Sequence, residues 1–176
     1  MSFLKNFIIT SRYDKPHGIF LLFFPCIWGL YLVNKNIADV FILCIIFLLG
    51  ACGMRSLGCI WNDINDKKFD REVARTKDRP IAQGKVKSFH IIIFALINSL
   101  IGVLPLFFIP IKAIFMSFIV VPLIIIYPFM KRITWWPQLW LGITFNWGVI
   151  VGYTTLSDKF FSFEMLTMYI GCILWT

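Results

Sequence analysis

"VFILCIIFLLGACGMRSLGCIWN", Val40–Asn62, is a run of 23 residues that contains a single charged side chain, Arg55. An α-helix needs roughly 20 predominantly apolar residues to cross the hydrocarbon core of a bilayer, and this stretch meets that length. Its apolar residues are continuous rather than alternating, which argues against a membrane β-strand. The stretch therefore predicts a transmembrane helix.

The rest of the chain has the same character. Its 176 residues have a mean hydropathy of +0.81 and only 15% charged side chains, whereas about a quarter is usual in a soluble domain. We expect an all-α integral membrane protein with one helix-bundle domain, 1–176. Its spans are expected at roughly 17–34, 39–61, 89–109, 113–130, 137–156 and 164–176, the last of them incomplete because about 20 apolar residues are needed.

The net charge of +8 follows the expected topology rather than a nucleic-acid-binding pattern. Thirteen bases fall on one side of the expected membrane: Lys5, Arg12, Lys15, the eight from Lys67 to Lys87, Lys131 and Arg132. Three fall on the other side: Lys35, Lys112 and Lys159. The positive-inside rule then places the N-terminus and the loop 62–88 in the cytoplasm.

"NDINDKKFDREVARTKDRPIAQGKVK", Asn62–Lys87, begins at the last residue of the first quoted run and carries five acidic and eight basic side chains. A loop that simply meets water would also be charged. However, Asn62, Asp66 and Asp70 recur at intervals of four, so on a continuing helix they share one face. Arg55 lies on nearly the same face, deeper in the membrane, where it either pairs structurally with a carbonyl or acid or contacts substrate.

Stacked carboxylates repel one another, and a divalent cation between them offsets that repulsion. Mg²⁺ typically binds one or two carboxylates together with phosphate oxygens. The nearby Arg75 and Arg79 could hold those phosphates, since a guanidinium binds phosphate bidentately. The spacing therefore predicts a site for a Mg²⁺–diphosphate.

Two further groups of bases fall on the same side of the membrane. "RYDKPHG", Arg12–Gly18, precedes the first span, and "YPFMKR", Tyr127–Arg132, ends the fourth. Each alone is explained as a topology or interfacial anchor. Three charged groups on one membrane face favour a shared site.

These residues resemble a known pattern. Asn62-Asp63-x-x-Asp66-x-x-x-Asp70, followed by Val73-x-Arg75-Thr76-x-x-Arg79-Pro80, is similar to the first aspartate-rich motif of the UbiA-type membrane prenyltransferases. "RYDKPHGIFLLFFPCIWGL" and "YPFMKRITWWPQ" resemble that family's first-span and fourth-span signatures. Within the family, the signatures look most like those of the enzymes that prenylate 4-hydroxybenzoate in ubiquinone synthesis.

The resemblance implies a bundle of about nine spans in the bacterial inner membrane, of which five to six are present. It implies Mg²⁺ held by Asn62, Asp66 and Asp70, with Asp63 assisting. It implies that Arg75, Arg79, Lys131 and Arg132 face a polyprenyl diphosphate, and that Arg12 meets the carboxylate of an aromatic acid such as 4-hydroxybenzoate. Membrane lipid is the other expected contact, and no nucleic acid is expected.

One part of the family pattern is missing. Relatives carry a second aspartate-rich motif on a later span, and this chain ends at the preceding stretch, "YIGCILWT". We therefore expect a truncated domain that is inactive alone, either a degenerate fragment or half of a split enzyme with a separately encoded C-terminal half. Another aromatic acceptor stays an alternative, while a CDP-alcohol phosphotransferase is disfavoured because its D-G-x-x-A-R pattern is absent.

Overall fold

In the computed structural model, which describes residues 3–33 and 36–176, all regular elements of the described residues are helices. Four of them are long and apolar enough to cross a membrane: Val40–Asn65, Ser88–Phe108, Ile111–Met130 and Pro137–Leu156. Two shorter apolar helices, α2 (His17–Tyr31) and α10 (Phe163–Trp175), accompany these four. The predicted all-α membrane fold is confirmed.

Three of the four membrane-length segments are each divided into two helical pieces. The unbroken one is α3 (Ile37–Asn65), which is followed by the short α4 (Lys67–Asp70). The others divide into α5 (Ser88–Val103) with a 3₁₀ turn η1 (Leu104–Phe108), α6 (Ile111–Ile119) with α7 (Val121–Ile133), and α8 (Pro137–Phe145) with α9 (Gly148–Leu156). Pro105 and Pro122 each lie in the first turn of the second piece, where a proline cannot continue the preceding ladder of hydrogen bonds.

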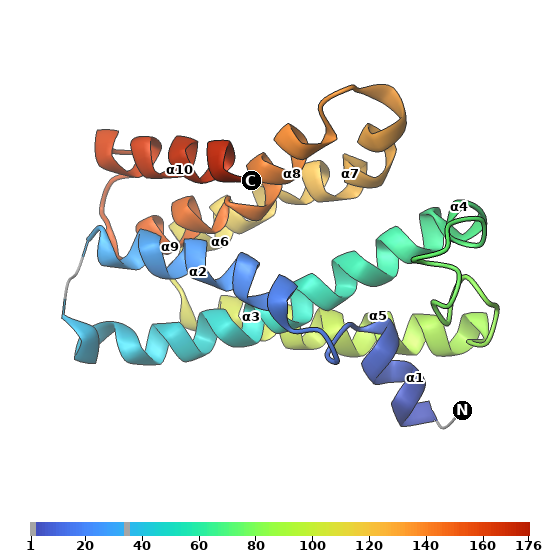
Figure 1. Cartoon of the computed structure of the whole chain (residues 1–176). Helices are drawn as coiled ribbons and strands as arrows, with labels where there is room; N and C mark the ends of the chain where they lie inside the picture. The colour runs from blue at the N-terminus through green and yellow to red at the C-terminus, as the bar shows by residue number, and fades with distance from the viewer. Residues whose placement is uncertain (1–2, 34–35) are drawn as a thin grey trace.

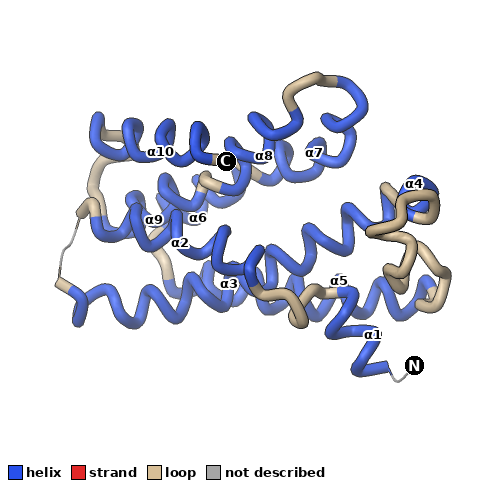
Figure 2. The backbone as a smooth tube through the Cα atoms, in the orientation of Figure 1, coloured by secondary structure: helices blue, strands red, loops and turns tan. Residues whose placement is uncertain are grey.

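Figure 1 shows the long helices running in roughly one direction, so that the molecule has two ends. The short N-terminal helix α1 (Phe3–Thr10), α4 and the α7–α8 connection lie toward one end. The α9–α10 connection and the C-terminal end of α2 lie toward the other, and Figure 2 shows the longest stretch of non-helical chain after α4. The segments that carry the expected site residues therefore lie toward one end of the bundle.

The helices α2 and α9 cross with their backbones in contact. A Cβ placed on Gly29 of α2 would collide with the Val149 carbonyl, and one on Gly152 of α9 would collide with the Cys26 carbonyl. Small residues are the usual means of close helix packing in membranes, because lipid provides no hydrophobic drive for association. Around this crossing lies the main core, which includes Leu30, Val149 and Ile150.

Candidate functional site: a polar cluster at the end of α3

The helical hydrogen bonds continue through the aspartate motif. The N–H of Asp66 donates to the Asn62 carbonyl (2.9 Å), and the N–H of Asp70 donates to the Asp66 carbonyl (2.8 Å). Asp66 caps α3 and leads directly into α4. The three residues therefore stack on successive turns, with Asp70 buried and the other two half-buried. The segment predicted as loop 62–88 thus begins as helix.

Asp63 is the centre of the polar cluster. Its side chain is only 3% exposed, and both of its oxygens are engaged. Oδ2 accepts from Arg12 Nη2 at 2.7 Å, and Oδ1 accepts from Arg79 Nη1 at 3.0 Å. Arg79 Nη1 also donates to Asp70 Oδ2 at 2.8 Å. Two arginines and two aspartates from distant parts of the sequence therefore form one network with balanced charge.

Arg12 reaches Asp63 from an unusual backbone position. It follows α1 with φ of +60°, the left-handed region that glycine normally occupies at a helix end. The N–H of Tyr13 donates to the Ile8 carbonyl, and that of Arg12 to the Ile9 carbonyl, which is the Schellman arrangement. A side chain in this conformation costs about 1 kcal/mol. The turn aims the guanidinium at Asp63, which gives a physical reason for arginine here.

A buried amide holds this turn against α5. Asn98 is fully buried; its Oδ1 accepts from the Tyr13 hydroxyl at 2.7 Å, and its Nδ2 donates to Ser11 Oγ at 2.9 Å. Burial raises the pKa of Tyr13, so the phenol keeps the proton that it donates to Asn98. Sequence reasoning missed Ser11, Tyr13 and Asn98 as positioning residues. A lone amide within the uncharged run 88–111 was the available signal.

The segment after α4 folds back over the motif. Thr76 is buried and its hydroxyl donates to the Asp70 carbonyl at 3.0 Å, while Arg71 Nε donates to the Ala82 carbonyl at 2.6 Å. Val86 packs with Ile60 and Phe94 in a second small core. These contacts bring Arg79 to the carboxylates.

The other predicted site residues are not all brought to this cluster. Arg75 is exposed. Lys131 and Arg132 lie in the last turn of α7, but their side chains are outside the described part of the structure. The structure therefore joins Arg12, Asp63, Asp70 and Arg79 directly, and it places Asn62 and Asp66 on the adjoining turns. It gives no side-chain position for the fourth-span bases.

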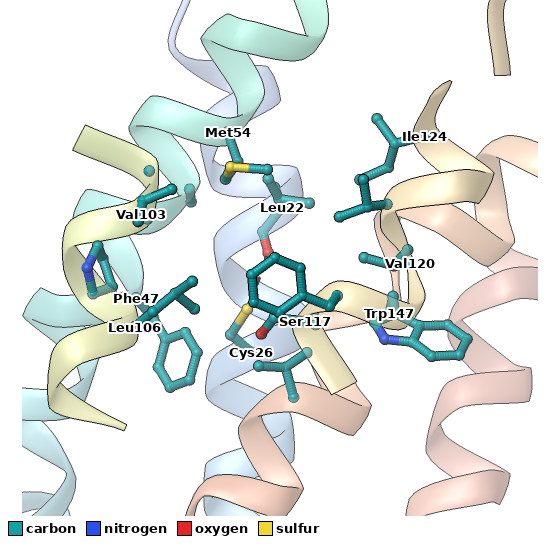
Figure 3. Close-up of a pocket in the computed structure, with 18 of the residues that line it drawn as sticks. Leu22, Cys26, Phe47, Met54, Val103, Leu106, Ser117, Val120, Ile124 and Trp147 are labelled. Atoms are coloured by element: carbon teal, nitrogen blue, oxygen red, sulfur yellow. Dashed lines mark hydrogen bonds between the residues drawn. The ribbon is translucent and has the colours of Figure 1, made fainter. Parts of the chain in front are cut away.

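A cavity of about 270 Å³ lies between the helices. Figure 3 shows Leu22 and Cys26 of α2, Phe47 and Met54 of α3, and Trp147 around it. Nearly all of its lining is hydrocarbon or aromatic, with the hydroxyl of Ser117 among the few polar groups. Such a lining suits an apolar chain and excludes strongly hydrated groups.

A second, larger cavity of about 750 Å³ lies on another side of α2. Phe24 and Trp28 of α2, Phe145 of α8 and Trp175 of α10 contribute to its wall. These side chains leave an apolar concave surface between three helices.

The motif and the fold together define a class of protein. The chain belongs to the UbiA prenyltransferase family, whose sequence profile matches residues 22–176. The predicted family membership is therefore confirmed. Enzymes of this family generally depend on Mg²⁺.

Several curated proteins are similar in sequence to this chain. A 4-hydroxybenzoate octaprenyltransferase of Marinomonas sp. (strain MWYL1) is 34% identical, over 100% of this chain and 62% of the relative. One of Pseudomonas syringae pv. tomato is 39% identical, over 97% and 57%. The mitochondrial 4-hydroxybenzoate polyprenyltransferase of Rattus norvegicus is 37% identical, over 98% and 46%. The chain thus spans about half the length of the curated relatives it matches.

Two solved structures share the fold. An apo UbiA homolog from Aeropyrum pernix K1 superposes with a TM-score of 0.71 at 28% identity, covering 90% of this chain and 59% of its own. A digeranylgeranylglyceryl phosphate synthase superposes with a TM-score of 0.74 at 19% identity, covering 99% and 60%. At that identity, the second shows the fold alone. The chain is a multi-pass integral membrane protein.

The donor set can be compared with what Mg²⁺ requires. Across residues 3–33 and 36–176, no group of three or more His, Cys, Asp or Glu side chains gathers around a possible metal position. The aspartate motif instead offers two carboxylates and an amide, Asp66, Asp70 and Asn62, on successive turns. Mg²⁺ bound through one or two carboxylates completes its shell with water and phosphate oxygens, so this set fits a metal that arrives with a diphosphate.

Proposed function

We propose that this chain forms the diphosphate-binding part of a Mg²⁺-dependent enzyme that transfers a polyprenyl group from polyprenyl diphosphate to the ring of 4-hydroxybenzoate. The names of the relatives that are 34–39% identical support this donor and acceptor. Because the chain spans about half of those relatives, the activity is proposed for its assembly with a segment that supplies the remaining helices. That segment either continues this chain or is encoded separately.

The observation that carries the proposal is the stack of Asn62, Asp66 and Asp70 beside Arg79. In the proposed site, the amide and two carboxylates hold Mg²⁺, and the metal neutralises charge that develops on the leaving diphosphate. Arg79 lies within hydrogen-bonding distance of Asp70, so it can exchange part of that contact for a phosphate oxygen. Arg75, Lys131 and Arg132 are the further proposed diphosphate contacts.

The proposed reaction breaks one bond and forms another. The bond between the first prenyl carbon and the diphosphate oxygen breaks, and its electron pair leaves with the diphosphate. The ring carbon ortho to the acceptor hydroxyl bonds to the allylic cation, and the ring then loses a proton to restore aromaticity. Cationic side chains such as Arg79 stabilise the leaving group, because charge develops there in the transition state.

The cavity of about 270 Å³ is the proposed position for the first part of the prenyl tail. Its lining, which includes Phe47 and Trp147, is almost entirely apolar. Exclusion of water matters because water would capture the allylic cation as an alcohol. The proposed location is the bacterial inner membrane with the motif on the cytoplasmic face, since thirteen bases gather on that side against three.

The test uses purified chain in detergent, and membranes that contain the chain with and without a C-terminal segment from a relative. We expect Mg²⁺-dependent binding of polyprenyl diphosphate to the chain, and transfer to radiolabelled 4-hydroxybenzoate in the complemented membranes. Asp66→Ala and Asp70→Ala should abolish both, whereas Asp158→Ala, at an exposed position in the α9–α10 connection, should not. Undiminished binding and transfer in either motif variant would overturn the proposal, and transfer only to another aromatic acceptor would replace 4-hydroxybenzoate.

A further inference from the structure

The two faces of the short helix α1 are reversed relative to those of a helix on the surface of a soluble protein. In water, such a helix normally turns its apolar residues to the core and its polar residues outward. In α1, Asn6 and Thr10 are buried, at 8% and 0% exposed, whereas Leu4 and Ile8 are 64% and 37% exposed. Each pair is four residues apart, so each pair marks one face of the helix. The outward face of α1 is therefore apolar.

This outward face lies beside a second apolar surface, which belongs to α5. The rings of Phe3 and Phe7 each contact the Phe94 ring, with centroids 5.2 Å apart. The Phe3 ring also contacts His90 at 5.3 Å, and His90 contacts Phe89 at 6.2 Å. The exposed apolar side chains of α5 recur at intervals of three and four residues: Phe89, Ile92, Leu96 and Leu100. Because α5 belongs to a membrane-length apolar segment, this stripe meets acyl chains, and α1 packs next to it.

The length and direction of α1 suit the membrane interface rather than a span. Its eight residues measure about 12 Å, less than half of the ~30 Å hydrocarbon core. Figure 1 shows α1 steeply inclined to α5, toward the end of the bundle where α4 lies. An interfacial helix lies in the plane of the bilayer, with its apolar face at the boundary between headgroups and acyl chains. Lys5 is exposed next to Leu4, and a lysine at this depth extends its ammonium group to the headgroups.

We propose that α1 is an interfacial anchor, whose face of Leu4 and Ile8 inserts between lipid acyl chains in the leaflet on the side of the aspartate motif. The anchor is connected directly to the polar cluster. The turn after α1 carries Arg12 to Asp63, and Asn98 holds the same turn against α5. The helix that contacts lipid and the turn that orients this arginine are therefore one continuous piece of chain. The placement of α1 in lipid is independent of the reaction proposed above.

The test places a photoactivated amino acid, p-benzoylphenylalanine, at single positions of the whole chain in vesicles of phosphatidylethanolamine and phosphatidylglycerol. Leu4 and Ile8 are the test positions. Ile92, in the exposed stripe of α5, is the positive control, and Gln83, exposed in the segment after α4, is the negative control. After irradiation, mass spectrometry detects the added mass of one phospholipid. We expect lipid adducts at Leu4 and Ile8 in a yield comparable to that at Ile92, and none at Gln83.

Two results of this experiment would overturn the inference. Lipid adducts at Ile92 without adducts at Leu4 and Ile8 would show that the outward face of α1 meets water. Adducts of Leu4 or Ile8 with a second copy of the chain, seen as a doubled mass, would show that protein covers this face instead of lipid.

Leu4→Asp provides a second measurement that needs no crosslinker. An aspartate in the first turn favours a helix in water through the helix dipole, but here it removes an apolar contact with lipid. We therefore expect the α1 amides of Leu4→Asp to exchange hydrogen for deuterium faster than those of the wild type in the same vesicles. Gln83→Asp, at an exposed position away from α1, should leave that exchange unchanged. Equal or slower exchange in Leu4→Asp would contradict insertion of α1 into the leaflet.

Discussion

Arginine side chains at the end of α3 and deeper along α3 have different kinds of partner. At the end of α3, Arg12 and Arg79 share the buried carboxylates of Asp63 and Asp70. Deeper in the bundle, Arg55 contacts a thiol and an aromatic ring, and the described residues give it no carboxylate. The paired cluster is a structural unit that joins α1, α3 and the segment after α4. Among the described residues, the deeper guanidinium is held by these two contacts rather than by an ion pair.

The strongest way to break the paired cluster is Asp63→Ala. It removes the shared partner of Arg12 and Arg79 and leaves both charges partly buried, as their side chains are 18% and 22% exposed. Removing one member of such a buried pair costs about 3–5 kcal/mol. We expect a loss of that size in the free energy of unfolding in detergent. Asp158→Ala, at an exposed carboxylate, is the control and should change nothing measurable.

The apolar part of the molecule is most easily disturbed at the α2–α9 crossing. Gly152→Ala would force the new Cβ against the Cys26 carbonyl, so the two helices must separate. Overpacking of this kind costs about 1–3 kcal/mol. Gly58→Ala is the matched control, because a Cβ there meets nothing within 4 Å. Its gain in helix propensity should leave the chain as stable or slightly more so. Equal melting temperatures for both variants would contradict the close crossing.

Filling the cavity tests whether the apolar interior serves a ligand. Val120→Trp places a large ring at the lining between α6 and α7. Binding of a long polyprenyl diphosphate should weaken by about tenfold, equivalent to about 1.4 kcal/mol, and that of a short one less. Phe115→Trp, at a 58% exposed position of α6, is the control. The same loss in both variants, measured by titration, would remove the cavity from the proposal.

The smallest expected effect separates the backbone of Arg12 from its side chain. Arg12→Gly and Arg12→Ala both lose the bond to Asp63. Glycine adopts φ of +60° without penalty, so Arg12→Gly should be more stable than Arg12→Ala by about 1 kcal/mol. Chemical unfolding of the two variants measures this difference directly. If alanine is equally stable, the left-handed turn is not retained in the folded chain.

The sequence predicted those features of the fold and the site that depend on local spacing. The uncharged runs predicted an all-helical membrane protein, and the four-residue spacing predicted one face for Asn62, Asp66 and Asp70. The same spacing placed Arg55 on this face. The breaks in three of the membrane-length segments were not predicted. Two of the three breaks coincide with Pro105 and Pro122; hydropathy averages over these residues, and neither can donate a hydrogen bond to the preceding helix.

The sequence by itself determined the class of fold, the family and the helix face that Arg55, Asn62 and Asp66 share. Hydropathy, the aspartate motif and the helical period can all be read from neighbouring residues. Only the tertiary structure decided which charges meet. Arg12 and Asp63 are 51 residues apart, and Tyr13 and Asn98 are 85 apart. Such pairs depend on how the helices cross and how the turns aim their side chains. The crossing of α2 and α9 and the pairing of Arg12 rather than Arg55 with a carboxylate are decided at that level.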